Sequence, residues 1–253
     1  MTRPAALPLL MTAALVAPAA ARAGIDEIAS ASDSLFTAPE SADSRQRDYA
    51  TLKAAMRQNP DAYELLWRGA RAGWAIADRL DEDKDRDELT QLGEEAMRWS
   101  GHARELKPDG LEGHFWHGLA ISVYARGISI LSALVQGLSG QYEADMNFII
   151  TKDPAWGGGA AQRALGRYYF RLPRIKRDLA RSETLLRQAL EYDPKRLRTH
   201  LYMADTFAAQ GKVAEARAEY RRVLDTPPGP NDMNEVETLR ANAQRGLNAL
   251  ERR

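Results

Sequence analysis

Several features that are common in proteins are missing from this sequence. None of its 253 residues is cysteine, which excludes disulfide bonds and a lipid anchor on a cysteine. Its 35 basic and 35 acidic residues balance, so its charge gives no indication of a nucleic-acid partner. The motifs GxSxG, GxxxxGKS/T and HExxH are also missing. We therefore predict that the protein is not an enzyme and uses no cofactor.

The start of the chain differs in composition from the rest. Arg3 precedes an uncharged stretch over residues 5–20, and Ala-Arg-Ala follows at 21–23. This pattern predicts a secretory signal peptide over residues 1–23, cleaved after Ala23, and hence a periplasmic protein that is not a lipoprotein. The alternative is an uncleaved N-terminal anchor. The apolar stretch is short and contains prolines, which argues against a membrane span.

Prolines that follow helical segments recur along the remaining chain. They lie at positions 60, 108, 154, 194 and 228, at spacings of 48, 46, 40 and 34 residues. The last spacing is the period of the tetratricopeptide repeat, in which two helices form one unit. In successive repeats, a small residue stands early in the first of the two helices, where it would let the helices approach closely. These small residues are Gly69, Gly118, Gly166 and Ala204.

These repeats predict an all-α fold, a right-handed array of helical hairpins resembling a tetratricopeptide solenoid, with about ten to eleven helices. No segment alternates with the period of a strand. A single domain is expected over residues 24–253, with a capping helix at 232–251 whose apolar residues form one stripe. The expected hairpins span 25–58, 61–106, 110–151, 157–192 and 195–225.

Two segments lengthen the early repeats. The acidic sequence DEDKDRDE at 81–88 resembles the start of a calcium loop, but Arg86 and Leu92 stand where such a loop requires Gly and Glu. We therefore predict a solvated loop. The apolar sequence ISILSALVQGL at 128–138 is too short to cross a bilayer. It is interpreted either as a buried helix in an enlarged core, or as the apolar wall of a ligand cavity or an oligomer contact.

His114 and His117 form the pattern that comes nearest to a metal site. They are three residues apart, which places both on one side of a helix and within reach of one ion. No third acidic or cysteine ligand follows at a suitable spacing. We therefore predict packing histidines and no metal.

Residues 153–174, DPAWGGGAAQRALGRYYFRLPR, place three glycines after Trp156 in a helical chain. Each glycine costs a helix about 1 kcal/mol relative to alanine. The glycines lack the spacing of a phosphate-binding loop. One interpretation is a loop whose free N–H groups hold a carboxylate beside Arg163. The other is a bend, with Trp156, Tyr168 and Tyr169 packed between hairpins.

The first interpretation predicts a cavity bordered by residues 115–138 and 156–172, lined by apolar side chains with a few polar groups. The candidate ligand-binding residues are Phe115, Tyr124, Trp156, Gly157, Gly158, Gly159, Arg163, Tyr168 and Tyr169.

Part of the sequence resembles the T-component (TatT) family of tripartite ATP-independent periplasmic (TRAP) transporters. The resemblance lies in the segment GGGAAQRALGRYYFRLPR, in the following helix that ends in LEYDP, and in THLYMADTFAAQGKVAEARAEYRRVLDTPP. That family has a Gly-Gly-x-x-x-x-Arg-x-x-Gly-x-x-Tyr…Leu-Pro segment between degenerate tetratricopeptide-like hairpins. The resemblance extends over residues 44–228 in organisation and is specific over 157–173. The matching positions, to which the resemblance gives a structural role at the cavity, are Gly157, Gly158, Arg163, Gly166 and Pro173.

The resemblance implies an all-helical periplasmic protein that forms a trimer and binds the transporter's solute-binding subunit. It also implies an internal cavity that passes an apolar or carboxylate ligand. Family members are typically lipoproteins, whereas this chain has no cysteine to carry a lipid. The alternative hypothesis is a general cell-envelope scaffold that captures a protein segment in an open groove and binds no small ligand.

Overall fold

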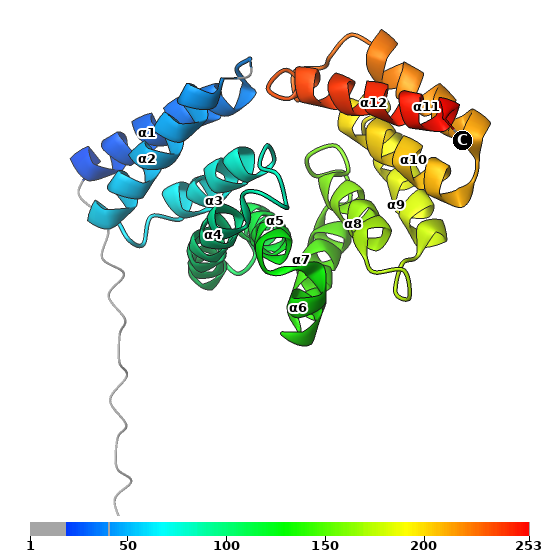
Figure 1. Cartoon of the computed structure of the whole chain (residues 1–253). Coiled ribbons are helices and arrows are strands. Elements are labelled where there is room, and N and C mark those ends of the chain that lie inside the picture. Colours follow the sequence, from blue (N-terminus) through cyan, green and yellow to red (C-terminus); the bar gives the residue numbers. More distant parts are fainter. Residues whose placement is uncertain (1–18, 40, 253) are drawn as a thin grey trace, which may run out of the picture.

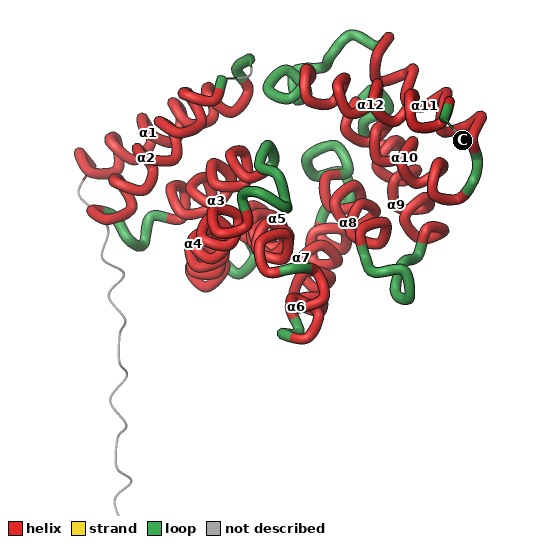
Figure 2. Tube along the Cα trace, in the orientation of Figure 1, coloured by secondary structure: helices red, strands yellow, loops and turns green. Residues whose placement is uncertain are grey.

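The computed structural model describes residues 19–39 and 41–252, and the regular structure of these residues is helical, without a strand (Figures 1 and 2). The prediction of an all-α fold is confirmed. The helices are α1 (Ala19–Thr37), α2 (Ala42–Gln58), α3 (Tyr63–Ala77), α4 (Arg86–Leu106), α5 (Leu111–Ile128), α6 (Ile130–Val135), α7 (Leu138–Lys152), α8 (Ala160–Arg171), α9 (Leu179–Tyr192), α10 (Leu197–Gln210), α11 (Val213–Asp225) and α12 (Val236–Glu251).

The helices pair into the five predicted hairpins, and α12 follows as the predicted last helix. The described residues contain twelve helices, more than the ten to eleven predicted, because the apolar insert adds the short α6. The proposed cleavage point after Ala23 lies within α1, and residues 1–18 of the predicted signal peptide lie outside the described residues.

The hairpins follow one another in a curved array, with α1 and α2 at one end and α11 and α12 at the other (Figure 1). The two ends approach each other across the concave side. Arg79, in the turn between α3 and α4, also reaches across and donates a hydrogen bond of 2.6 Å to the carbonyl of Asn234, which lies just before α12. The curvature therefore brings residues more than 150 positions apart in the sequence to one place.

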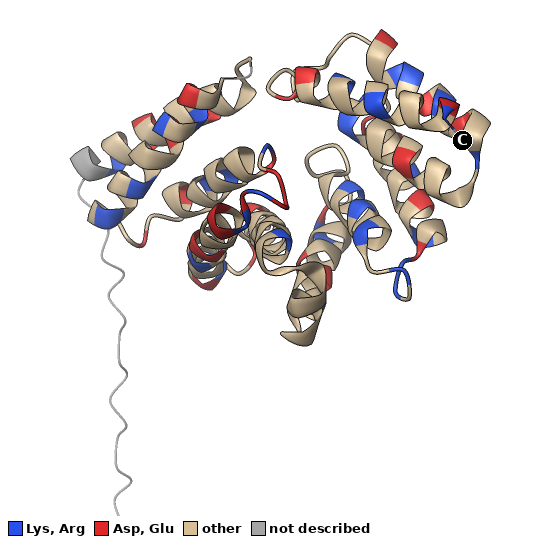
Figure 3. Ribbon diagram, in the orientation of Figure 1, with Lys and Arg blue, Asp and Glu red and all other residues tan. Residues whose placement is uncertain are grey.

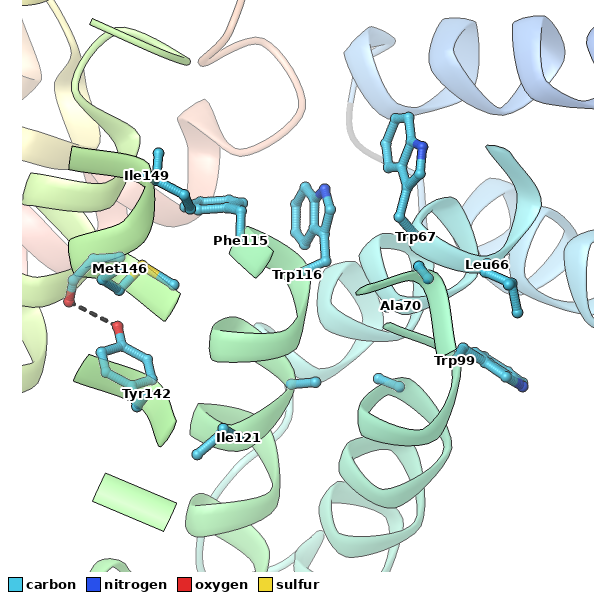
Figure 4. Packing of buried hydrophobic residues seen from close by; sticks show 14 of the residues in the cluster. Leu66, Trp67, Ala70, Trp99, Phe115, Trp116, Ile121, Tyr142, Met146 and Ile149 are labelled. Carbon is cyan, nitrogen blue, oxygen red and sulfur yellow. Dashed lines mark hydrogen bonds between the residues drawn. The ribbon is translucent and has the colours of Figure 1, made fainter. Parts of the chain in front are cut away.

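The core extends along the whole array. Its largest cluster of buried apolar residues runs from α2 to α8, and a second cluster fills the space between α9 and α12. Figure 4 shows part of the first cluster, with Phe115 on α5 pointing toward Ile149 and Met146 on α7. The dashed line there is the 2.9 Å hydrogen bond that the Tyr142 hydroxyl donates to the carbonyl of Ala164.

The small residues predicted at helix crossings lie where neighbours approach closely. A Cβ atom on Gly118 would lie 2.2 Å from the methyl carbon of Met146, and one on Gly166 would lie 2.8 Å from Leu186. Sequence reasoning missed Gly93, which lies at the crossing of α4 and α5. A Cβ atom there would lie 2.5 Å from the backbone of Tyr124.

The interpretation of residues 128–138 as a buried helix is wrong for much of the segment. Ser129 and Gly137 have positive φ angles of 88° and 73° and separate α6 from its neighbours. The short helix α6 packs against the rest of the protein on one side, where Ala133 is buried. Leu131 and Val135 lie on its other side and are exposed to solvent. Within residues 19–39 and 41–252, no helix has the length and apolar character that a bilayer span requires.

Candidate ligand cavity on the concave face

The concave side of the array contains a cavity of about 780 Å³. Its lining comes from the end of α1, from α3, from α5 to α8, and from α10 and α12. Helices from both ends of the chain contribute, so the cavity exists only because the array curves. Its volume lies within the range of small-molecule sites in proteins.

One wall of the cavity is aromatic. Phe36 packs edge-on against Trp116 with ring centroids 6.0 Å apart, and Trp74 lies 5.7 Å from Trp116 on the other side. Phe115 continues the wall to Trp156, at 5.0 Å. Phe115 and Trp116 are consecutive residues of α5, and both contribute to this wall. Toward α6 and α7 the lining is aliphatic, with Ile130, Leu134 and Leu138 among its residues.

The three glycines form the turn before α8. Gly157, Gly158 and Gly159 have φ angles of 57°, 61° and 69°, in the left-handed region that glycine adopts without steric cost. A Cβ atom on Gly159 would lie 2.7 Å from the backbone of Ala189 in α9. Glycine is therefore required there by both the turn and the close approach to α9.

The predicted set of free N–H groups is only partly present in this loop. The N–H of Trp156 donates to the carbonyl of Asp153, that of Gly158 to Ala155, and that of Ala160 to Trp156. The turn satisfies these three donors itself, because three successive left-handed residues fold the chain back. The bend interpretation is correct for the glycines, and only Gly157 of the three lines the cavity.

Arg163 is the charged group in this region that is most available to a ligand. Its side chain is 8% exposed and lines the cavity. Within the described residues its one hydrogen bond goes to the carbonyl of Gly158, at 3.1 Å, and it makes no ion pair. Burial, together with the nearby charge of Arg196, lowers the pKa of Arg163 to about 10. It remains a cation at neutral pH, and a carboxylate beside it would be strongly favoured.

The wall that contains Arg163 is rich in arginine. Seven arginines and four carboxylates line the cavity, so its polar part carries an excess of positive charge. Arg167 forms an ion pair with Asp205 at 2.6 Å, whereas Arg163 forms no ion pair with a described residue. The seven arginines are Arg126, Arg163, Arg167, Arg171, Arg196, Arg198 and Arg245, and the carboxylates are Asp78, Glu82, Asp205 and Glu235.

The turn between α3 and α4 connects the two sides of the cavity. Asp78 accepts hydrogen bonds from Arg198 of α10 at 2.7 and 3.2 Å. Glu82 accepts from Arg126 of α5 at 2.9 Å and from Arg171 of α8 at 2.6 Å. Burial alone would raise the pKa of Glu82, but the hydrogen bond and charge of Arg171 outweigh it and hold the pKa below its ordinary value. The prediction that 81–88 is merely a solvated loop is therefore wrong for Glu82.

The structure brings together five of the nine candidate residues. Phe115, Trp156, Gly157, Arg163 and Tyr168 line the cavity. The other four lie outside its lining. Gly158 and Gly159 face α9, Tyr169 is buried with its hydroxyl 2.8 Å from Glu143, and Tyr124 lies at the crossing with α4.

The sequence did not indicate Trp74, Trp116, Arg196 or Arg198 as lining residues. These residues come from other repeats, and no local pattern in the sequence connects them with the glycine stretch.

His114 and His117 are buried in a polar cluster on the other side of α5. Their Nδ1 atoms lie 2.8 and 2.6 Å from the two oxygens of Asp145, and Arg104 also approaches this carboxylate, at 3.3 Å. Burial alone would raise the pKa of Asp145, but the hydrogen bonds from the two histidines hold it below its ordinary range. Asp145 lies about 30 positions after the histidines, so sequence spacing did not reveal it.

The same local arrangement recurs in a later repeat. The Nε2 atom of His114 lies 3.0 Å from the carbonyl of Pro108, and that of His200 lies 2.9 Å from the carbonyl of Pro194. Each histidine follows its proline by six residues, which places it at the same position of the repeat. Within the described residues no group of three or more His, Cys, Asp and Glu side chains is arranged to hold a metal ion.

Comparison with known proteins supports the repeat architecture. A tetratricopeptide repeat family matches residues 175–243. The structure is similar to TTC0263, a thermophilic TPR protein from Thermus thermophilus, with a TM-score of 0.63 and 16% identity over 88% of this chain and 98% of that chain. The fold is tetratricopeptide-like. In arrays of this kind each repeat packs on its neighbours, and the small rotation between repeats creates an extended concave surface.

The assembly chaperone of RpL4 (Acl4, residues 1–338) matches with a TM-score of 0.33 and 18% identity over 81% of this chain and 98% of that chain. No curated protein matches the sequence.

Proposed function

We propose that this protein is a non-enzymatic, exported binding protein that holds a ligand with an apolar body and a carboxylate in its concave cavity. The observation that carries the proposal is Arg163, a buried guanidinium on the cavity wall that has no carboxylate partner among the described residues. The aromatic wall and the aliphatic lining from α6 and α7 would cover the apolar body. A buried arginine binds a carboxylate through charge-assisted hydrogen bonds.

The resemblance of residues 157–173 to the T-component of TRAP transporters supports a narrower role. In that role the protein is an accessory component that assembles as a trimer, binds a periplasmic solute-binding subunit and receives or delivers the ligand. The alternative is a general envelope scaffold that binds a protein segment, which is the usual activity of tetratricopeptide-like arrays. The aromatic wall and the aliphatic lining favour a ligand carrier, because a scaffold needs an open groove lined by exposed polar side chains.

The Arg163→Gln variant is expected to bind a long-chain fatty acid about 10- to 150-fold more weakly than the wild type, the equivalent of roughly 1.5–3 kcal/mol for a lost hydrogen bond to a charged group. Binding is measured by titration calorimetry and by tryptophan emission, since Trp74, Trp116 and Trp156 all line the cavity. The methyl ester of the same acid is the key comparison, because it lacks the charge. Wild type and variant should bind the ester with equal affinity.

Arg98→Gln removes an exposed arginine of α4 that does not line the cavity, and it should leave fatty-acid binding unchanged. If neither fatty acids nor small carboxylates bind the wild type, the ligand proposal is wrong and the scaffold alternative remains. If Arg163→Gln lowered the affinity for the fatty acid and for its methyl ester equally, the substitution would only disturb the shape of the cavity.

Export gives a separate prediction. Expressed from its own start codon in a bacterium with a periplasm, the protein should appear in the periplasmic fraction with Gly24 as its first residue. N-terminal sequencing of that fraction tests this directly. A chain that begins at Met1 in the cytoplasmic fraction would rule out both the cleaved signal and a role in periplasmic transport.

A further inference from the structure

Among the described residues, the three large apolar side chains most exposed to solvent are Ile175, Val135 and Leu131, at 95%, 87% and 63%. Ile175 lies in the loop between α8 and α9, while Val135 and Leu131 lie on α6. The exposure of α6 agrees with the expectation that 128–138 could form an oligomer contact, whereas the loop at 173–177 was not singled out from the sequence. Single exposed aliphatic residues are ordinary on protein surfaces, so the question is whether these three belong to one surface.

The two segments lie at the same end of the molecule. The Tyr168 hydroxyl, close to the end of α8, is hydrogen-bonded to the hydroxyl of Ser139, close to the start of α7 and a few residues after α6. In Figure 1, α6 and the loop after α8 both project from the lower edge of the array, away from the approaching ends of the chain. We call this surface the α6–loop face, made of residues 130–136 and 173–177.

Charge on the α6–loop face is of one sign. Residues 128–142 contain no charged side chain, whereas 171–177 (RLPRIKR) contain four cations and no acid. Arg174, Lys176 and Arg177 are exposed, and none of them makes an ion pair with another described residue. Figure 3 shows the loop in blue beside an α6 that is entirely tan.

Nearby carboxylates offset the four cations of residues 171–177 only in part. Glu82 is engaged by Arg171 and Arg126, and Glu143 accepts hydrogen bonds from Tyr168 and Tyr169. Asp178, directly after the loop, caps α9 by accepting a 2.8 Å hydrogen bond from the N–H of Arg181. The α6–loop face therefore presents protruding aliphatic side chains next to unpaired cations.

We propose that the α6–loop face docks on an anionic lipid bilayer. Aliphatic side chains that enter the boundary between head groups and acyl chains, flanked by cations that pair with anionic head groups, are the combination that holds peripheral proteins at membranes. A protein partner would need a complementary shape around Ile175 and Val135, whereas a bilayer accepts separate protruding side chains. The charge matches an anionic surface and opposes a basic one.

The test is co-sedimentation of the full chain with two kinds of vesicle, phosphatidylcholine alone and phosphatidylcholine with phosphatidylglycerol. The wild type should bind the vesicles with phosphatidylglycerol, and binding should weaken as sodium chloride is added. Each juxtamembrane cation contributes about a fivefold change in affinity. The variant Arg174→Gln/Lys176→Gln/Arg177→Gln should therefore bind about 100-fold more weakly at low salt.

The apolar contribution is tested separately. Val135→Ser/Ile175→Ser keeps every cation and should reduce binding by at least about tenfold. Both substitutions are at strongly exposed positions, so the fold is expected to be unaffected. As a second readout, the emission of Ile175→Trp should shift to shorter wavelength when phosphatidylglycerol vesicles are added.

The matched control is Arg57→Gln/Lys195→Gln/Arg221→Gln, which removes three exposed cations elsewhere on the molecule and should leave vesicle binding nearly unchanged. An equal loss in this control would overturn the proposal, because net charge rather than the face would control binding. So would a wild type that stays in the supernatant with phosphatidylglycerol vesicles. If Val135→Ser/Ile175→Ser instead lowers the oligomer mass in sedimentation velocity and vesicles never bind, the face joins copies of this chain.

Discussion

Replacing Arg198 by methionine is expected to lower the free energy of unfolding by about 3–5 kcal/mol. Arg198 is buried and donates hydrogen bonds to Asp78, to Glu235 and, at 2.8 Å, to the Tyr202 hydroxyl. Methionine has a comparable length, so it fills the space but leaves two carboxylates without their cation. Removing one partner of a buried ion pair costs far more than the pair itself contributes.

The pH dependence of this loss identifies its cause. Burial alone would raise the pKa of Asp78, but the charge and hydrogen bonds of Arg198 outweigh it and hold the pKa below its ordinary value. In the wild type this contribution is fully present above that ordinary value, near pH 4, and is lost as the pH falls through the lowered pKa. The variant lacks the contribution, so the gap between the two proteins should narrow as the solution is acidified.

Urea denaturation at pH 7 and in acid measures both effects. Arg187→Met is the matched control, because Arg187 pairs with Glu183 on the surface of α9 and is 60% exposed. Its loss should be below about 1 kcal/mol. The variant Arg198→Met/Asp78→Asn/Glu235→Gln should recover part of the stability. A loss in Arg198→Met that is no larger than the control, or that is the same at both pH values, would contradict this account.

The Gly93→Ala substitution is expected to destabilise the protein by roughly 1–3 kcal/mol, although it adds one methyl group. The new Cβ atom would lie 2.5 Å from both the Cα and the backbone nitrogen of Tyr124. Backbone atoms in a packed helix cannot rotate away, so α4 and α5 must separate. This lost packing outweighs the gain of about 1 kcal/mol that alanine brings to a helix.

Gly140→Ala is the control for this prediction. Gly140 lies within α7, and a Cβ atom there would meet no atom within 4 Å. The same substitution should therefore stabilise the protein by up to about 1 kcal/mol. Thermal and urea unfolding of both variants give the comparison. Equal effects of the two substitutions would show that the close approach of α4 and α5 is not needed for stability.

Local patterns in the sequence were sufficient for the positions of the five hairpins and the last helix, though not for the short α6. A proline near each hairpin boundary cannot continue a helix, and the prolines at 108 and 194 indeed follow the ends of α4 and α9. Small residues such as Gly118 and Gly166 marked helix crossings, because close packing of two backbones needs them. The three glycines after Trp156 predicted a loop, since left-handed φ angles favour glycine.

The sequence by itself therefore determined an all-helical array, its five hairpins and the last helix, because helix starts, stops and crossings depend on neighbouring residues and a repeating period. Tertiary structure alone decided which residues share the cavity. Arg198 and Asp78 lie 120 positions apart, and Arg171 and Glu82 lie 89 apart. The curvature that joins them is the sum of small rotations between successive hairpins. The accumulated rotation depends on every hairpin in the array and not on any short stretch of residues. The pairing of charges across the cavity therefore could not be predicted from local sequence patterns.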